Sequence, residues 1–177
     1  MKQPAKITFC GIITARSVVF MLLSYFPYLT YAVPAVTGLL MMIIVIEINT
    51  RWAFAAYAAA SVLVFIFAEP ESKLMYICLF GYYPILKALI ERLHKPAAEW
   101  LLKLLVFNAA VLLVYFVFAK LFGISLDDFN TFGRYGVYAF LAAGNAVFVL
   151  YDIAVSRMAM FYMNTLHMRI ARIFKGK

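Results

Sequence analysis

YICLFGYYPILKALIERLHK, at residues 76–95, is the stretch that decides the fold of this chain. It begins as an apolar helix, passes through Gly-Tyr-Tyr-Pro at 81–84 and ends with three basic residues. An apolar helix with a basic end is typical of a membrane span whose basic end faces the cytoplasm. Pro84 predicts a kink that leaves the carbonyl of Phe80 without its usual hydrogen-bond donor.

The composition of the whole chain agrees with this interpretation. Of its 177 residues, 67% are hydrophobic and 18% are aromatic, and the mean hydropathy is +0.93. Soluble domains are about 45–50% apolar, so this excess indicates a surface that faces lipid. The net charge is +8, but the basic residues lie between apolar segments, which favours membrane orientation over nucleic-acid binding.

We expect an all-α, polytopic integral membrane protein with six transmembrane helices in a compact bundle. A helix of about 20 residues crosses roughly 30 Å of hydrocarbon. Lys2 and Lys6 precede an apolar run, as in a signal peptide, but no small-residue cleavage site follows. The apolar run is therefore expected to be the first span. The six-helix domain is predicted over residues 1–153, with polar loops at 69–73 and 120–134, and a basic amphipathic tail over 154–177. The predicted spans are 7–26, 34–48, 52–68, 74–92, 97–119 and 135–153.

The basic residues of the loops predict the orientation. If the N-terminus is inside, only Lys73, Lys120 and Arg134 face outward. The excess of positive charge then lies on the inner side, which places both termini in the cytoplasm. The residues on the inner side are Lys2, Lys6, Arg51, Lys87, Arg92, Lys95, Lys103, Arg157, Arg169, Arg172, Lys175 and Lys177.

The tail has a two-sided pattern when it is wound as a helix. Such a basic amphipathic helix is typical of a segment that lies on the inner membrane surface, either as an anchor to anionic lipid or as a docking surface for a partner. Its polar side would hold Arg157, Asn164, Arg169, Arg172 and Lys175, and its apolar side Ala159, Tyr162, Leu166, Ile170 and Ile173.

Arg16 lies near the middle of the first predicted span. A charge near the bilayer centre is costly, so we expect Arg16 to face the protein interior and to pair with Glu47 or Asp152. The pair would be a structural ion pair or part of a transport or docking site. Asn108 and Asn145 also need partners in lipid, and they are interpreted either as contacts between helices or as the lining of a polar pocket.

The chemistry of an enzyme or a metal centre is not indicated. The sequence has no His-Glu-x-x-His zinc helix, no Gly-x-Ser-x-Gly elbow and no phosphate-binding glycine loop. Cys10 and Cys78 lie in apolar surroundings without metal-ligand spacing, which is typical of buried small side chains. No catalytic residue, metal or cofactor is therefore predicted.

Small residues recur four positions apart at three places, a spacing that lets helices approach closely in lipid. The pairs are Gly11 and Ala15, Ala55 and Ala59, and Ala139 and Ala143. With six short spans, cytoplasmic termini and a small pair in span one, the chain resembles the substrate-binding S components of bacterial energy-coupling-factor vitamin transporters. The resemblance implies that Gly11 and Ala15, where the family has two alanines, dock onto a membrane coupling subunit.

The same resemblance implies a ligand site among the outer helix halves, under the loop that follows span one. Two hypotheses follow. One is a binding subunit for uptake of a small solute, powered by a separate ATPase complex in the bacterial cytoplasmic membrane. The other is a structural or scaffolding membrane protein, since the rod-shape protein of the cell-elongation machinery has a related six-span form. The predicted pocket residues are Tyr28, Tyr31, Tyr82, Tyr83, Asn108 and Tyr138.

Overall fold

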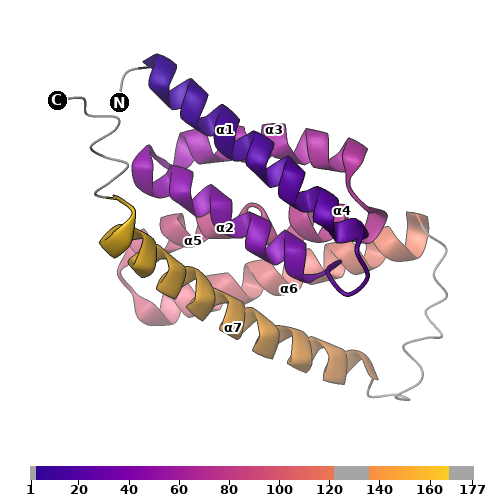
Figure 1. The fold of residues 1–177 in the computed structure, drawn as a ribbon. Helices are drawn as coiled ribbons and strands as arrows, with labels where there is room; N and C mark the ends of the chain where they lie inside the picture. Colours follow the sequence, from indigo (N-terminus) through magenta and orange to yellow (C-terminus); the bar gives the residue numbers. More distant parts are fainter. Residues whose placement is uncertain (1–2, 122–135, 168–177) are drawn as a thin grey trace.

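The computed structural model describes the backbone of residues 3–121 and 136–167, and the side chains of residues 3–114 and 141–167. All regular structure in these parts of the chain is helical (Figure 1). The short elements η1 and η3 are 3₁₀-helices, and η2 is a π-helix. In chain order the elements are α1 (Gln3–Leu22), η1 (Leu23–Tyr25), α2 (Ala32–Glu47), α3 (Thr50–Phe67), α4 (Pro70–Met75), η2 (Tyr76–Phe80), α5 (Tyr83–Ile90), η3 (Glu91–Leu93), α6 (Pro96–Leu121) and α7 (Gly136–Thr165).

The protein is an all-helical membrane protein. In the described parts of the chain, five helical segments are long and apolar enough to cross a membrane. They are Gln3–Tyr25, Thr50–Phe67, Pro70–Leu93, Pro96–Val114 and Leu141–Thr165. The remaining predicted span, 34–48, corresponds to α2, whose 16 residues extend about 24 Å at 1.5 Å per residue.

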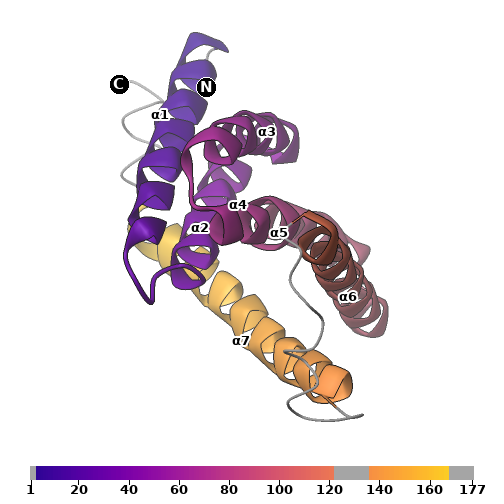
Figure 2. The same cartoon turned by 90° about the vertical axis from the view of Figure 1, so that its right-hand side faces the viewer.

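The apolar helix α2 organises the bundle. It contacts α1 and α3 on one side and α5 and α7 on the other (Figure 2). The beginning of α1 and the described end of α7 lie at the same end of the bundle (Figure 1). Helix α7 continues past residue 153 to Thr165, as the sequence predicted for the start of the tail.

Small residues on α3 allow it to pack closely in the core. Ala53, Ala56 and Ala60 are at most 4% exposed and lie on one stripe of the helix. The predicted contact pair, Ala55 and Ala59, is exposed instead. The four-residue spacing therefore predicted the wrong face of this alanine-rich helix as the buried one. With alanine on several faces, spacing alone does not show which face is buried.

The fourth span is interrupted where the sequence predicted it. Its helix begins at Pro70, so the predicted polar loop at 69–73 is wrong, because Pro70 is well suited to the first turn of a helix. The chain then winds as a π-helix, and the amide of Gly81 donates to the carbonyl of Tyr76 at 2.8 Å. Helix α5 restarts at Tyr83 with Pro84 in its first turn, which removes the conflict between proline and a continuous helix.

Gly38 of α2 lies directly against this interruption. A Cβ atom at this position would overlap the carbonyl oxygen of Phe80 and would lie 2.9 Å from the hydroxyl oxygen of Tyr151. The missing side chain therefore lets the backbone of α2 touch the backbone at the end of η2. This contact sets where the interrupted segment lies along the axis of α2. Because α5 follows directly, it also sets the position of α5.

Candidate functional site

Four charged side chains from η3, α5, α6 and α7 form a cluster at the protein interior, hereafter the ionic cluster. Its members are Lys87, Glu91, Lys103 and Asp152. Lys87, Lys103 and Asp152 are each 4% exposed, whereas the Glu91 side chain is 44% exposed. The cluster therefore has a buried part of two lysines and one aspartate, and one acidic member that reaches solvent.

Both carboxylates bridge both lysines. One oxygen of Glu91 lies 2.8 Å from the ammonium of Lys87 and 2.9 Å from that of Lys103. Asp152 accepts a hydrogen bond from Lys87 and a longer one, 3.3 Å, from Lys103. Two positive and two negative charges cancel, which is the condition under which buried charges are tolerated.

Tyr83 completes the cluster from α5. Its hydroxyl donates to the Oδ1 atom of Asp152 at 2.5 Å, and the tyrosine is 3% exposed. Asp152 thus receives three donors from two helices. Because each donor lies on α5 or α6 and the acceptor on α7, these bonds set how α7 sits against the other two helices.

The sequence counted Lys87 and Lys103 among the basic residues of the inner side of the membrane and predicted no partner for either. In the structure both side chains are buried against Asp152. A signal was present, since Lys87 and Glu91 are four residues apart and so share one helix face. Nothing in the local pattern showed that Lys103 and Asp152, which are 49 positions apart, would join them.

Asn108 and Asn145 form a second polar contact between α6 and α7. Each side-chain amide donates to the carbonyl oxygen of the other, at 2.9 and 3.1 Å. Each also donates to a backbone carbonyl one turn earlier, Leu104 for Asn108 and Leu141 for Asn145. Of the two roles that the sequence left open, the structure shows the contact between helices.

Replacing Asn108 by leucine should weaken the contact between α6 and α7. The change leaves the amide of Asn145 without its partner, and such interhelical bonds are worth about 1–2 kcal/mol in model systems. The double variant Asn108→Leu with Asn145→Leu should lose less stability than the two single losses added together. Denaturant titration in mixed micelles measures these differences, and strictly additive losses would show that the two amides do not interact.

Aromatic rings fill the space between the asparagine pair and the ionic cluster. Phe107 of α6 stacks on Phe148 of α7 with ring centroids 4.4 Å apart, and Tyr83 meets Phe148 edge-on at 5.0 Å. Beside Tyr82 and Tyr83 lies a cavity of about 10 Å³, which has room for at most one water molecule. The seam between α6 and α7 is therefore polar, aromatic and then ionic along its length.

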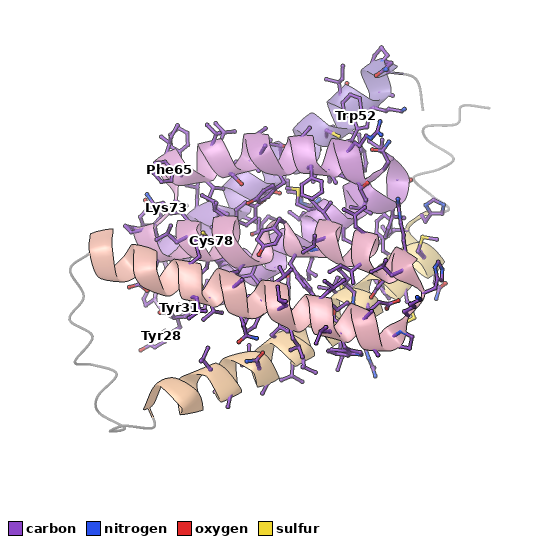
Figure 3. The ribbon with its side chains drawn as sticks, turned by 180° about the vertical axis from the view of Figure 1, so that it is seen from behind. Tyr28, Tyr31, Trp52, Phe65, Lys73 and Cys78 are labelled. Carbon is purple, nitrogen blue, oxygen red and sulfur yellow. The ribbon has the colours of Figure 1, made fainter. Side chains whose placement is uncertain are left out.

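The predicted outer pocket is not assembled by the described side chains. Tyr28 is 98% exposed with a φ of 72°, and Tyr31 is 59% exposed. Figure 3 shows both at the end of the molecule that holds Lys73, away from Trp52. No hydrogen bond or ring contact among the described residues joins these two tyrosines to the other predicted pocket residues, Tyr82, Tyr83 and Asn108. The side chain of Tyr138 lies outside the described residues.

The loop that carries Tyr28 and Tyr31 is attached to α4. The Tyr31 hydroxyl donates to Glu71 at 3.1 Å, and the Ser72 hydroxyl donates to the carbonyl of Thr30 at 2.8 Å. Partial burial, and after it the adjacent Glu71 carboxylate, raises the pKa of Tyr31. The loop is thus held by hydrogen bonds to the beginning of the fourth span.

The predicted pairing of Arg16 is wrong. Arg16 is exposed, outside the buried stripe of α1, and its guanidinium lies 5.8 Å from the ring centroid of Phe20. Both proposed acidic partners are engaged elsewhere, Asp152 in the ionic cluster and Glu47 with α7. The cost of a central charge predicted an interior position, but the helix rotation that buries Ser17 turns Arg16 outward.

Glu47 connects the end of α2 to the end of α7. One of its oxygens accepts a hydrogen bond from Tyr162 at 2.7 Å and lies 2.9 Å from Nδ1 of His167. Tyr162 is buried, whereas Arg157 and Asn164 are exposed, but Leu166 from the predicted apolar side is exposed as well. The described part of the tail thus packs against the bundle, and residues 168–177 lie outside the described residues.

An open apolar groove runs between α1 and α3, with a volume of about 370 Å³. The predicted docking residues Gly11 and Ala15 line it, and a Cβ atom at Gly11 would meet nothing within 4 Å. The predicted pair Ala55 and Ala59 lines its other wall, with Trp52 at one end. Small side chains on both walls leave the backbones of two helices accessible from outside the bundle.

Comparison with protein-family models, curated proteins and solved structures finds no match for this chain. Within the described residues, no three His, Cys, Asp or Glu side chains come together as a metal site. The ionic cluster, the asparagine pair and the groove are therefore interpreted from their own geometry.

Proposed function

We propose that this protein is a membrane-embedded binding subunit for uptake of a small solute, of the kind found in energy-coupling-factor transporters. Separate coupling and ATPase subunits would supply the energy, since the sequence has no nucleotide-binding motif. The chain would cross the bacterial cytoplasmic membrane six times with both termini inside. The observation that carries this proposal is the seam between α6 and α7, which holds the half-buried asparagine pair and the buried Lys103 and Asp152.

Buried ionisable groups are rare in membrane spans and usually mark the path or site of a solute, an ion or a proton. Here Lys87, Lys103 and Asp152 lie inside helices that are otherwise apolar. An equally stable packing with leucine or phenylalanine would avoid the cost of burying charges. Binding of a solute with polar groups would explain why charged residues are present at these positions.

The proposed orientation follows from charge and connectivity. The beginning of α1 and the described end of α7 lie at one end of the bundle, which agrees with an even number of crossings (Figure 1). The shorter α2 would complete the sixth crossing, with local bilayer thinning to match its length. Most of the basic loop residues then fall on the cytoplasmic side.

The groove between α1 and α3 supports a coupling partner. A transmembrane helix that packs there would meet Gly11 and Ala15 and would lie beside the exposed Arg16. Among the described residues Arg16 has no carboxylate partner, so an acidic side chain on the incoming helix would compensate its charge. Membrane lipids would cover the rest of the outer surface.

A leucine at Gly11 tests the docking surface. We expect Gly11→Leu to release coupling and ATPase subunits during affinity purification from the native membrane, because the larger side chain occupies the groove at a position where a Cβ atom meets nothing within 4 Å. Ala146→Leu, an equally bulky change on the exposed face of α7, should retain them. If Gly11→Leu retains the partners as well as Ala146→Leu does, this surface does not dock them.

A structural or scaffolding role is the second candidate, and one observation favours it. The cavity beside Tyr82 and Tyr83 holds about 10 Å³, far less than the several hundred Å³ of a typical ligand site. A scaffold needs no cavity, whereas a binding subunit must open one. Under the scaffold hypothesis, partners would still be lost in Gly11→Leu, but no small molecule would accompany the purified wild-type protein.

A further inference from the structure

We infer that Lys87 and Lys103 form a binding site for an oxyanion, a phosphate or carboxylate group, in which the side chain of Glu91 occupies the place of the ligand. This inference does not rest on solute uptake, since a scaffold could carry the same site. It rests on the geometry of the ionic cluster, in which one acidic member differs from the others.

The two lysines converge on a single point. The Oε1 atom of Glu91 lies 2.8 Å from one ammonium and 2.9 Å from the other, although the lysines lie on different helices. Two ammonium groups that share one oxygen are a common arrangement for holding phosphate or carboxylate, since charge-assisted hydrogen bonds are short and strong. The point that Glu91 occupies is therefore an oxyanion position.

Asp152 does not bind both lysines equally closely. It accepts a close hydrogen bond from Lys87 and one from Tyr83, but its distance to Lys103 is 3.3 Å. The short ionic partner of Lys103 is Glu91. If Glu91 leaves, the buried group keeps two positive charges and one negative charge, so an incoming anion restores neutrality.

Glu91 is placed so that it can leave without moving a helix. It begins the three-residue element η3, and its side chain is 44% exposed, whereas the lysine side chains are each 5% exposed. Rotation of this one side chain into solvent uncovers both ammonium groups from the end of the bundle. Asp152 and Tyr83, on the inner side of the cluster, would stay in place.

The surface around this opening is basic. Arg92 and Lys95 lie one and four positions after Glu91, and both are exposed. Positive charge around an opening raises the local concentration of anions and speeds their approach. The ligand would therefore reach the lysines from the membrane surface at this end, either as a soluble anion or as the headgroup of an anionic lipid.

Glu91→Gln is the variant that tests the site. It keeps the shape of the side chain and removes the charge that competes with the ligand. Loss of the competing negative charge should tighten the binding of inorganic phosphate about tenfold, which corresponds to about 1.4 kcal/mol. Glu99→Gln is the matched control, because Glu99 lies near the same end, on α6, and is not a member of the cluster.

Phosphate binding is measured on the full chain in nanodiscs of zwitterionic lipid. Trp100 serves as the probe, since its ring centroid lies 5.5 Å from the Lys103 ammonium, and Trp52→Phe removes the other tryptophan. We expect a saturable change in Trp100 emission that is about tenfold more sensitive to phosphate in Glu91→Gln than in Glu99→Gln. Equal sensitivity in the two variants would overturn the inference.

Anionic nanodiscs distinguish the source of the ligand. If phosphatidylglycerol lowers the phosphate affinity of Glu91→Gln, the headgroup competes for the lysines, and if it has no effect the ligand is a soluble anion. Both results require the oxyanion site. If Glu91→Gln does not fold, the wild-type protein tests the site. At constant ionic strength, phosphate should change the emission of Trp100 and chloride should not. The absence of a phosphate-specific change in a folded wild type would reject the site.

Discussion

Asp152→Asn is expected to lower the free energy of unfolding by about 3–5 kcal/mol, the largest effect of any single change proposed for this protein. The amide keeps the size of the side chain but removes its charge. Lys87 and Lys103 would then share only Glu91, leaving one uncompensated positive charge at 4% exposure. Tyr83 would also lose its charged acceptor.

Denaturant titration in mixed micelles measures this loss against Glu99→Gln, which removes a charge outside the cluster. A second variant separates charge from packing. Asp152→Asn with Lys103→Met leaves Lys87 and Glu91 as a balanced pair and should recover part of the loss. If Asp152→Asn is as stable as Glu99→Gln, the ionic cluster does not hold α7 against α5 and α6.

Gly38→Ala should be the second most damaging change, at about 1–3 kcal/mol, because it overpacks a contact between two backbones. The added methyl group would overlap the carbonyl oxygen of Phe80 and lie 2.9 Å from the hydroxyl of Tyr151. A flexible side chain could move aside, but the obstructing atoms belong mainly to the backbone of η2. Helix α2 would have to shift, and with it the position of α5.

Gly11→Ala is the matched control, since the same change on α1 meets nothing within 4 Å. It should be neutral or slightly stabilising, because alanine favours a helix more than glycine does. Thermal unfolding followed by loss of monodisperse protein compares the two. Equal midpoints would mean that α2 does not approach η2 as closely as the structure places it.

The sequence predicted the helices well because hydrophobic length is a strong signal in membranes. The helix boundaries lie mostly within four residues of the predictions, and the interruption at Pro84 is where proline chemistry requires it. The main error in the fold was the loop at 69–73, where Pro70 starts a helix. Charged residues near a span suggested a loop although proline and glutamate suit a first helical turn.

The candidate site was only partly predictable. Asn108 and Asn145 were singled out because polar groups in lipid need partners, and the structure joins them. The ionic cluster was missed because positive charge near a span end was taken as an orientation signal. Lys87 and Lys103 fit that rule in sequence, and only the packing of α7 shows that they are buried.

The sequence also did not predict how each helix is rotated about its axis, and therefore which of its faces is buried. Arg16 was expected inside because an exposed charge in a span is costly, yet its side chain is exposed. The cost of that position is what a partner helix would relieve. Sequence spacing identified Gly11 and Ala15 as small residues on one face but not which elements that face would meet.

Native mass spectrometry of the protein, purified gently from its own membrane, tests the proposed function most directly. A binding subunit should retain one small molecule per chain, together with coupling and ATPase subunits that depart in Gly11→Leu. The mass of the small molecule would give the class of the solute. A wild-type protein that carries only lipid and no transporter subunits would contradict the account and leave the scaffolding role.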